Sequence, residues 1–313
     1  MPETIELTSP SGTVKIRPDQ KLSLFTTFRI GGPAQFMARV TDESQAEAAL
    51  EWAEQMDLPV TSIGGGSNLL VDDAGIQGLV LAVRTTGKDA ETRVRVEEDD
   101  HQVRIWVPAQ MPISRLGHLS AERGWTGLVW CAGLPGVVGG AVVNNAGAHG
   151  GEMIDQLETI DVIRLADRKI ESWPAEKLNA AYRYTVLKHA PRPRDVVVLG
   201  ATFVLPRGDA EELVKQAKEF SAWRKQAQPT GACAGSVFTN PDGSYAGYLI
   251  DKAGLKGTTV GGVKISELHG NFMVNSGEAT AEDVRQMIAL IQDEVYRQFE
   301  VRLVPEIEQV GGK

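Results

Sequence analysis

The sequence predicts an α+β protein with two or three domains, and three observations support this prediction. Helix-like and strand-like segments alternate over roughly residues 20–85, short segments with every second residue apolar fill about 90–205, and two helix-length segments follow. A chain of 313 residues is also long enough to build more than one hydrophobic core.

Composition and charge disfavour some classes of function. Hydrophobic residues make up 42% and charged residues 23% of the chain, as in ordinary soluble globular proteins. The net charge of −9 disfavours binding to nucleic acid or to an anionic membrane surface. The N-terminus lacks a charged segment followed by an apolar core, and no stretch reaches about 18 apolar residues. We therefore expect neither an export signal of that kind nor a membrane span.

The two cysteines, Cys131 and Cys233, predict a reduced protein. They lie far apart in the sequence and match neither a metal-binding spacing nor a disulfide framework. We therefore expect no metal site and a cytoplasmic location.

The first alternating region begins with a turn at Gly31, Gly32 and Pro33 that leads into a strand. A helix follows over TDESQAEAALEWAEQM, with Thr41 or Asp42 as its N-cap and acidic residues in its first turn. The apolar runs VTSI and LLV, separated by the glycine turn GGGSN, complete a small α/β unit.

Period-2 patterning predicts a mainly antiparallel sheet over about 90–205, with strands in RVRVE, VRIWV, LETIDVIRL and VVVLGATFVL. A helix then runs through RGDAEELVKQAKEFSAWRKQAQP and ends at Pro229, and the turn at 207–209 marks a domain boundary. A second helix begins at Thr280, with Asp283 as its capping partner. The chain ends in the strand-like piece VRLVPEIEQV.

The first candidate binding motif is IGGGSNLLV, at residues 63–71. Successive glycine N–H groups after a strand suit a diphosphate, and Ser67 and Asn68 add side-chain donors. Leu69 stands where the Rossmann fingerprint has its third glycine, and no P-loop sequence occurs. The alternative is a tight strand turn without a ligand.

The second candidate motif is GLPGVVGGAVVNNAGAHGG, at residues 133–151. Positions without side chains let a flat or charged ligand lie against the backbone, where Asn144 and Asn145 can hydrogen-bond to it. The alternative is a glycine-rich corner of a sheet. Two such motifs in one chain favour a large dinucleotide, and the sheet context favours a flavin over a nicotinamide cofactor in its usual fold.

Three separate polar residues are candidates for chemistry. Arg183, between two tyrosines, can grip a carboxylate with two parallel hydrogen bonds, and the alternative is a solvated strand arginine. Glu306, after Pro305, is either functional or an exposed strand residue. Ser236 has no histidine or acid beside it, although a serine nucleophile needs a base.

The segment KGTTVGGVKISELHGNFMVN carries side chains that suit phosphates or polar sugar groups. A lone histidine in such a turn is more often structural. The candidates are Lys256, Lys264, Ser266, His269, Asn271 and Asn275.

Taken in order, these segments resemble the UDP-N-acetylenolpyruvoylglucosamine reductase family, which is also named UDP-N-acetylmuramate dehydrogenase, in its shorter form. The resemblance spans residues 26–311. The matching segments are TTFRIGGPA, IGGGSNLLV, GLVWCAGLPGVVGGAVVNNAGAHGGEM, AAYRYTVLK, AGSVFTNP, AGLKGTTVGGVKISELHGNFMVN and VPEIEQVG.

This resemblance implies a three-domain flavoprotein with a PCMH-type (vanillyl-alcohol-oxidase-like) FAD-binding region and a C-terminal α+β substrate-binding domain. The two FAD-binding subdomains would be residues 1–85, joined by a C-terminal strand at 301–313, and residues 86–207, and the substrate domain would be 208–300. FAD would be bound non-covalently by Arg29, Gly31, Gly64, Gly65, Gly66, Ser67, Asn68, Leu69, Gly133, Gly136, Gly139, Gly140, Asn145, Gly147 and Ala148.

The resemblance also implies a reaction, in which NADPH reduces FAD and the enolpyruvyl ether of UDP-N-acetylglucosamine then receives hydride at its terminal carbon. Arg183 and Glu306 match the residues that stabilise the negative charge on the substrate, and Ser236 matches the proton donor. The product, UDP-N-acetylmuramate, serves peptidoglycan synthesis and hence cell wall biogenesis, cell shape and division. The enzyme would be a cytoplasmic monomer. Substrate contacts would come from Tyr182, Lys225, Asn240, Lys264 and His269.

The sequence departs from the family pattern at several positions, and two alternative functions stay open. One alternative is a FAD-dependent sugar or alcohol oxidase with His149 as the site of covalent attachment. The other is a non-catalytic flavin or UDP-sugar binding protein. The departures are Thr239 for a basic residue, His149 for a tyrosine, the extra Asn144, Val304 for an acid and Glu308 for an arginine.

Overall fold

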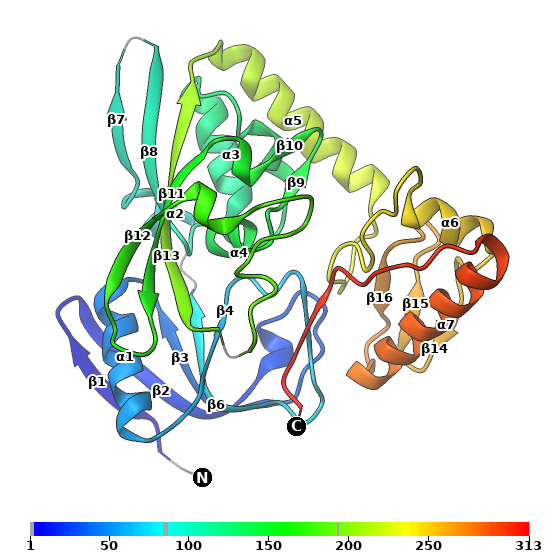
Figure 1. Ribbon diagram of the computed structural model, residues 1–313, viewed down its shortest axis with the longest axis horizontal. Helices are drawn as coiled ribbons and strands as arrows, with labels where there is room; N and C mark the ends of the chain where they lie inside the picture. Colours follow the sequence, from blue (N-terminus) through cyan, green and yellow to red (C-terminus); the bar gives the residue numbers. More distant parts are fainter. Residues whose placement is uncertain (1–2, 84–86, 100, 193, 313) are drawn as a thin grey trace. The chain divides into compact units, whose positions relative to one another are not determined.

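The computed structural model describes residues 3–83, 87–99, 101–192 and 194–312. The chain forms two compact units, each assembled from separate stretches of sequence, as the colours of Figure 1 let the reader follow. Each unit has its own apolar core. Unit 1 comprises Met1–Pro18, Phe36–Gly65 and Gly78–Trp223, and unit 2 comprises Asp19–Gln35, Gly66–Gln77 and Arg224–Lys313.

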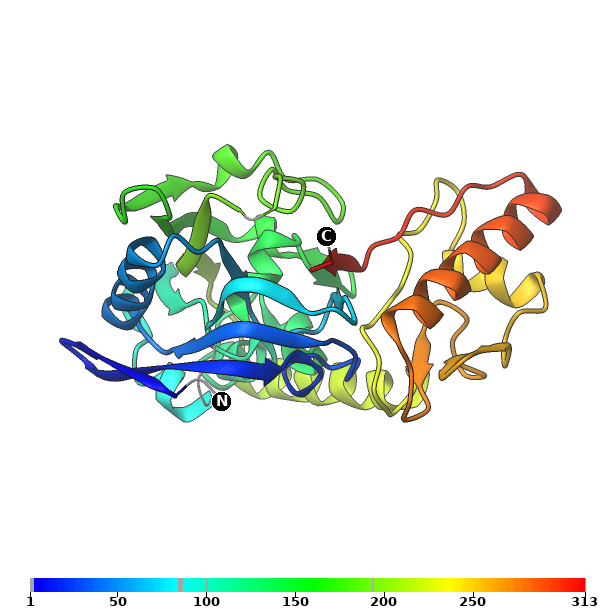
Figure 2. The same ribbon diagram turned by 90° about the horizontal axis from the view of Figure 1, so that it is seen from below.

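The first five-stranded sheet contains the N-terminal hairpin, which Figure 2 shows as a long blue ribbon. Its order is β1 (Ile5–Ser9), β2 (Gly12–Lys21), β3 (Pro33–Val40), β6 (Ile76–Val83) and β4 (Val60–Ile63). The β4 and β6 strands are parallel, as in an α/β unit. The α1 helix (Glu43–Gln55) packs against β1, and its N-cap is Asp42, whose carboxylate accepts a hydrogen bond from the Gln45 N–H at 3.0 Å.

The second sheet is antiparallel throughout, which confirms the expectation from period-2 patterning. Its order is β12 (Ile170–Pro174), β11 (Leu157–Arg164), β13 (Val196–Pro206), β8 (Gln102–Pro108) and β7 (Arg95–Glu98). The central β13 strand is buried along almost its whole length, so this sheet forms the middle of the unit 1 core.

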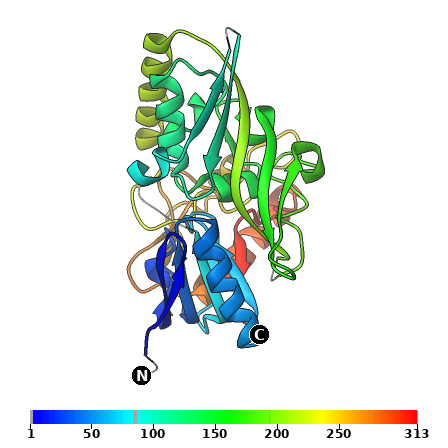
Figure 3. The same cartoon turned by 90° about the vertical axis from the view of Figure 1, so that its left-hand side faces the viewer.

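Short helices and strands complete unit 1, and Figure 3 shows α3 beside the second sheet. The glycine-rich residues 133–151, for which the sequence predicted no helix, contain α4 followed by a two-stranded ladder. The elements are α2 (Gly87–Glu91), α3 (Ile113–Glu122), α4 (Val138–Val143), β9 (Gly147–Ala148) and β10 (Gly151–Glu152). The α5 helix (Ala210–Ala227) begins in unit 1 and ends in unit 2.

Unit 2 packs two helices and a small antiparallel sheet around its own core. The sheet order is β14 (Thr259–Val260), β15 (Val263–Ile265) and β16 (Met273–Asn275), and the helices are α6 (Ala246–Lys252) and α7 (Ala281–Phe299). The tail is a strand only at β17 (Glu308–Val310), which pairs in parallel with β5 (Leu69–Val71). Residues 301–307 lie outside the named strands, and Pro305 among them forms an isolated β-bridge with Phe238.

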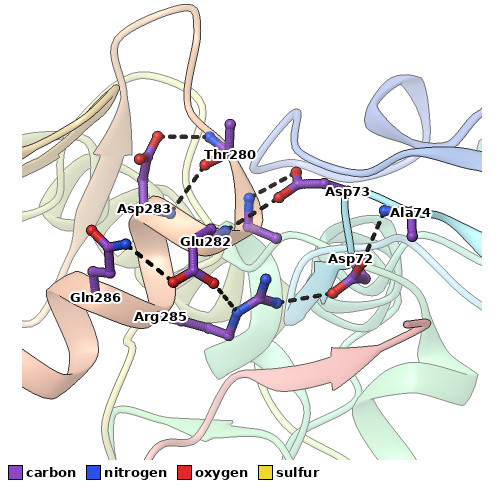
Figure 4. A network of polar contacts seen from close by, with 9 residues as sticks. Asp72, Asp73, Ala74, Thr280, Glu282, Asp283, Arg285 and Gln286 are labelled. Atoms are coloured by element: carbon purple, nitrogen blue, oxygen red, sulfur yellow. Dashed lines mark hydrogen bonds and ion pairs between the residues drawn. The ribbon is translucent and has the colours of Figure 1, made fainter. Parts of the chain in front are cut away.

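The start of α7 is bound to the turn that follows β5, as Figure 4 shows. The Asp73 carboxylate accepts hydrogen bonds from the N–H groups of Ala281 at 2.9 Å and Glu282 at 3.3 Å. The Asp72 carboxylate pairs with the Arg285 guanidinium at 3.0 Å. The predicted capping pair of Thr280 and Asp283 is also present. The contacts of Asp72 and Asp73 join the turn after β5 to α7 within unit 2.

Across the described part of the chain, every helix is too short or too polar to cross a membrane.

Candidate functional site

The two predicted glycine motifs meet in unit 1. A Cβ atom added to Gly65 would lie 2.6 Å from the Cα of Gly136, and one added to Gly64 would lie 2.8 Å from Cγ2 of Val137. These distances leave no room for side chains, so glycine is required for the backbones to approach. Gly140, in contrast, faces open space, because an added Cβ would meet nothing within 4 Å.

The turn after β4 presents donors that the protein itself does not use. The N–H groups of Gly65, Gly66 and Ser67 have no hydrogen-bond acceptor among the residues that the structure describes. Unpaired backbone donors in a partly buried turn are costly unless a ligand or water accepts from them. Three successive N–H groups suit the oxygens of a diphosphate, so this segment fits an anionic dinucleotide.

In unit 2, the residues before Pro33 are held close to this turn. The Thr27 N–H donates to the Gly66 carbonyl at 3.0 Å, and the Thr27 hydroxyl donates to the Cys233 carbonyl at 2.7 Å. Gly31 has φ +137°, and a Cβ atom added to it would lie 2.7 Å from the Cβ of Val71. Arg29 is exposed and has φ +55°. The predicted cofactor residues 29 and 31 thus lie on a segment bound to the glycine turn and to the chain just before Ser236.

Arg183 lies in unit 1, in a turn instead of a strand, and its side chain is only 17% exposed. Its guanidinium donates to the Gly147 carbonyl at 2.6 Å and to the Asn145 carbonyl at 3.3 Å, and the Glu152 carboxylate lies 3.8 Å away. The solvated strand arginine considered above is therefore wrong for this residue. The structure brings Arg183 together with the second glycine motif.

Asn145 uses its side chain inside the protein. Its amide donates to Glu152 at 2.8 Å and to the Ala181 carbonyl at 2.9 Å, its oxygen accepts from the Ile154 N–H at 3.1 Å, and the residue is 1% exposed. Through Ala181, this asparagine fixes the turn that carries Arg183. The Asn145 side chain therefore holds the protein's own turns, and the contact of this residue with FAD stays a prediction.

Ser236 and Glu306 lie on neighbouring segments of unit 2. The Glu306 N–H donates to the carbonyl of Val237 at 2.7 Å, and Phe238 forms a bridge with Pro305. Ser236 is half-buried, and its hydroxyl has no hydrogen-bond partner within the described ranges. This hydroxyl is free to donate to a bound molecule.

Three of the predicted substrate residues present polar atoms to solvent. Tyr182 is 48% exposed, and its ring lies 5.0 Å from the Arg183 guanidinium. Lys225 is exposed in the last turn of α5. Asn240 is exposed, and its side-chain oxygen accepts from the Ala246 N–H at 3.1 Å, at the start of α6.

The other two predicted substrate residues have partners within unit 2. The Lys264 ammonium pairs with the Glu267 carboxylate at 2.8 Å. Nδ1 of His269 accepts from the Asn271 N–H at 3.2 Å. Burial, followed by the positive charge of Lys256, lowers the pKa of His269 below its ordinary value. Both effects favour the neutral imidazole that this hydrogen bond requires.

Arg224 is a partly buried cation on α5 that sequence reasoning missed. The residue is half-buried, its guanidinium has no hydrogen bond or ion pair with any described residue, and burial lowers its pKa. Helical spacing is the signal that could have found it. Arg224 lies seven residues after the buried Ala217 on α5, hence on the inward face, whereas Lys225 faces outward.

His149 and the two cysteines have defined surroundings. The His149 ring stacks on Phe220 with centroids 4.1 Å apart and meets Trp223 edge-on at 5.0 Å. Both cysteines are free thiols, and burial raises the pKa of Cys131 to about 12. Cys131 is therefore an inert core residue.

Comparison with known proteins gives matches to each part of the chain. Residues 226–310 match the family described as the UDP-N-acetylenolpyruvoylglucosamine reductase C-terminal domain, and residues 34–172 match an FAD binding domain family. UDP-N-acetylenolpyruvoylglucosamine reductase of Chloroflexus aggregans is 38% identical over 299 residues, which cover 95% of this chain and 98% of that protein. The Synechocystis enzyme of the same name is 40% identical over 96% of this chain and 92% of its own length.

A solved structure is similar as well. The crystal structure of UDP-N-acetylenolpyruvylglucosamine reductase from Thermus caldophilus has 34% sequence identity and a TM-score of 0.75. The alignment covers 94% of this chain and 99% of that one.

Proposed function

Because this chain belongs to the UDP-N-acetylenolpyruvoylglucosamine reductase family, we propose that it reduces UDP-N-acetylglucosamine enolpyruvate to UDP-N-acetylmuramate with NADPH, through FAD. The observation that carries this proposal is the donor-lined glycine turn, from which hydrogen bonds run through the tail to Ser236 and Glu306. Such an enzyme is an oxidoreductase of peptidoglycan synthesis.

The residues proposed to hold FAD are those that the sequence singled out. The glycine turn at 64–69 would donate N–H groups to the diphosphate, and residues 29 and 31 would flank it. The second glycine motif would supply backbone without side chains, with Gly140 facing open space. FAD, when bound there, would take hydride from NADPH and pass it to the substrate.

Arg183 and Glu306 are proposed to stabilise negative charge on the substrate carboxylate as hydride arrives. The hydrogen bonds to two backbone carbonyls fix the direction of the Arg183 guanidinium before the reaction begins. A preorganised cation needs no rearrangement when charge develops, and electrostatic stabilisation of this kind is usually the largest single contribution to enzyme catalysis. Glu306 can contribute when it is protonated or donates through water.

Ser236 is proposed to give its proton to the carbon beside the carboxylate. An alcohol is a weak acid, but an enolate is a strong enough base to accept from it. The absence of a hydrogen-bond partner for the Ser236 hydroxyl among the described residues supports this role.

The substrate diphosphate and sugar are proposed to contact Tyr182, Lys225, Asn240, Lys264 and His269. Lys264 already pairs with Glu267, so binding a phosphate there requires exchange of one anion for another.

We also propose that the protein works as a cytoplasmic monomer. The proposed domains remain 1–85 with 301–313, 86–207 and 208–300, and the pairing of β17 with β5 supports joining the tail to the first of them.

The test is NADPH oxidation by the FAD-loaded protein with and without the enolpyruvyl UDP-sugar. We expect the sugar to accelerate oxidation and UDP-N-acetylmuramate to form in equal amount. Oxidation that the sugar does not accelerate would refute the proposal and favour a binding protein. Acid precipitation separates it from the oxidase alternative, because flavin that stays with the precipitate would indicate covalent attachment.

A further inference from the structure

Asn271 is a buried polar residue with no part in the reaction proposed above. It is 4% exposed and lies between Ser266 and β16 in unit 2. Its side-chain oxygen accepts from the Phe238 N–H at 2.9 Å, and its side-chain amide donates to the Phe238 carbonyl at 2.8 Å. Its own carbonyl accepts from the Val237 N–H at 2.9 Å. One residue thus binds three backbone groups of the two residues that follow Ser236.

The segment held by Asn271 is also bound on its other side. The Val237 carbonyl accepts from the Glu306 N–H at 2.7 Å, and the Thr239 N–H donates to the Val304 carbonyl at 2.9 Å. Residues 236–239 therefore form an extended segment between 271–272 and 304–306, with isolated bridges from Ser236 to Phe272 and from Phe238 to Pro305. The backbones that carry Ser236 and Glu306 share this arrangement, so displacing one displaces the other.

The hydrogen bonds continue from the tail to the glycine turn. The Asn68 amide donates to the Glu306 carbonyl at 3.2 Å, and the Glu308 N–H donates to the Asn68 carbonyl at 2.9 Å. The next residues along the two segments form the parallel pairing of β5 with β17. A continuous set of bonds therefore links the turn proposed to bind a diphosphate, the tail, and the Ser236 segment.

We propose that Asn271 is a positioning residue that sets the places of Ser236 and Glu306 for proton delivery, which rests on the reaction proposed above. A side-chain amide suits this task because its oxygen accepts from the N–H of Phe238 and its NH₂ group donates to the carbonyl of Phe238 in a buried place. Errors of about 1 Å in placing a reacting group reduce rates by as much as ~10²-fold.

The test compares Asn271→Asp with Asp283→Ala. Aspartate keeps the shape of asparagine, but its ionised carboxylate cannot donate to the Phe238 carbonyl. Asp283 accepts from the Thr280 and Gly262 N–H groups, and within the described ranges it forms no hydrogen bond with residues 236–239, so we expect its loss to lower stability without moving Ser236. Both variants are loaded with FAD and assayed by stopped flow well below their unfolding temperatures, with rates expressed per bound flavin.

For Asn271→Asp we expect NADPH to reduce the flavin normally, while reoxidation by the enolpyruvyl sugar slows by ~10-fold or more. Reoxidation should recover at low pH, because a protonated carboxyl regains the donor. Asp283→Ala should lower the unfolding midpoint and leave both half-reactions unchanged. Equal loss of both half-reactions, or reoxidation unaltered in Asn271→Asp, would overturn the proposal.

Amide hydrogen exchange gives a readout that does not depend on turnover. In Asn271→Asp, peptides covering 236–239 and 304–307 should exchange faster than in the parent protein, while α7 stays protected. Unchanged exchange in those peptides would refute the role of Asn271. A parent protein that does not reduce the sugar would instead refute the proposed function, so the two failures are distinguishable.

Discussion

At the scale of single residues, Ser236 has no adjacent base in the sequence, and its hydroxyl has no hydrogen-bond partner within the described ranges. A nucleophilic serine needs a base to remove its proton, whereas a proton donor needs only a basic acceptor. The surroundings of Ser236 therefore fit donation to a carbanion-like carbon.

This role predicts a separation of the two half-reactions in Ser236→Ala. NADPH should still reduce the bound flavin, because that step needs no proton from Ser236. Reoxidation by the enolpyruvyl sugar should slow by ~10² to 10⁴, the usual effect of losing a general acid. Stopped-flow absorbance of the flavin measures both steps. Ser276→Ala, at an exposed serine of unit 2, is the control, and equal slowing of both steps would make Ser236 structural.

The sequence indicated which residues carry useful chemistry, but it did not indicate which groups those residues contact in the fold. The position of Arg183 between tyrosines indicated a rigid arginine, but only the fold shows that its partners are carbonyls of a distant glycine motif. The polarity of Asn271 suggested a ligand contact, yet its amide is bound to Phe238, 33 residues away. Contacts across such separations leave no local pattern.

At the scale of elements, the cap of α7 has measurable energetic consequences. The Asp73 carboxylate binds two N–H groups at the positive end of this helix, so its loss removes a cap and a favourable dipole interaction. Asp73→Ala should lower the free energy of unfolding by about 1 kcal/mol, measured by urea titration. Asp72→Ala should cost less, because Arg285 keeps Glu282 as a partner and the pair is partly exposed.

Asp242→Ala serves as the control for this comparison, since Asp242 is exposed and makes no hydrogen bond or ion pair in the described part of the chain. An Asp73→Ala protein as stable as the Asp242→Ala protein would show that solvent replaces the cap.

Elements with strong periodicity could be predicted closely. The α7 helix begins after Thr280 as its capping pair indicated, and β4 and β5 coincide with the apolar runs VTSI and LLV. The hairpin of β1 and β2 was missed because most of its residues are polar or exposed, with only Val14 and Ile16 buried in β2. The α4 helix was missed because glycine disfavours helices, and tertiary packing overrides that preference here.

At the scale of the whole molecule, each unit is built from stretches that are distant in sequence, such as residues 66–77 and 224–313 in unit 2. Periodicity reports only on neighbours along the chain, so this assembly left no signal in the composition or the spacing. The family resemblance supplied what local patterns could not, namely that the tail returns to the first third of the chain, where β17 pairs with β5.

The stability of the whole molecule should depend on FAD, because a ligand that binds only the folded state stabilises it by mass action. Free FAD at about 100 times its dissociation constant should add ~2.7 kcal/mol to the free energy of unfolding. The Gly140→Ala variant separates the stabilisation that FAD confers from the stability of the flavin-free protein. Its added Cβ meets nothing within 4 Å, and alanine favours helix α4, so the flavin-free variant should be as stable as the parent or more so.

If the open space at Gly140 belongs to the flavin, the same methyl group should weaken FAD binding and reduce the stabilisation that FAD confers. Thermal unfolding of both proteins at a series of FAD concentrations measures the two quantities independently. Gly65→Ala is the contrasting variant, because its Cβ would lie 2.6 Å from Gly136 and should destabilise the protein even without flavin. A Gly140→Ala protein that FAD stabilises as much as the parent would remove Gly140 from the proposed cofactor contacts.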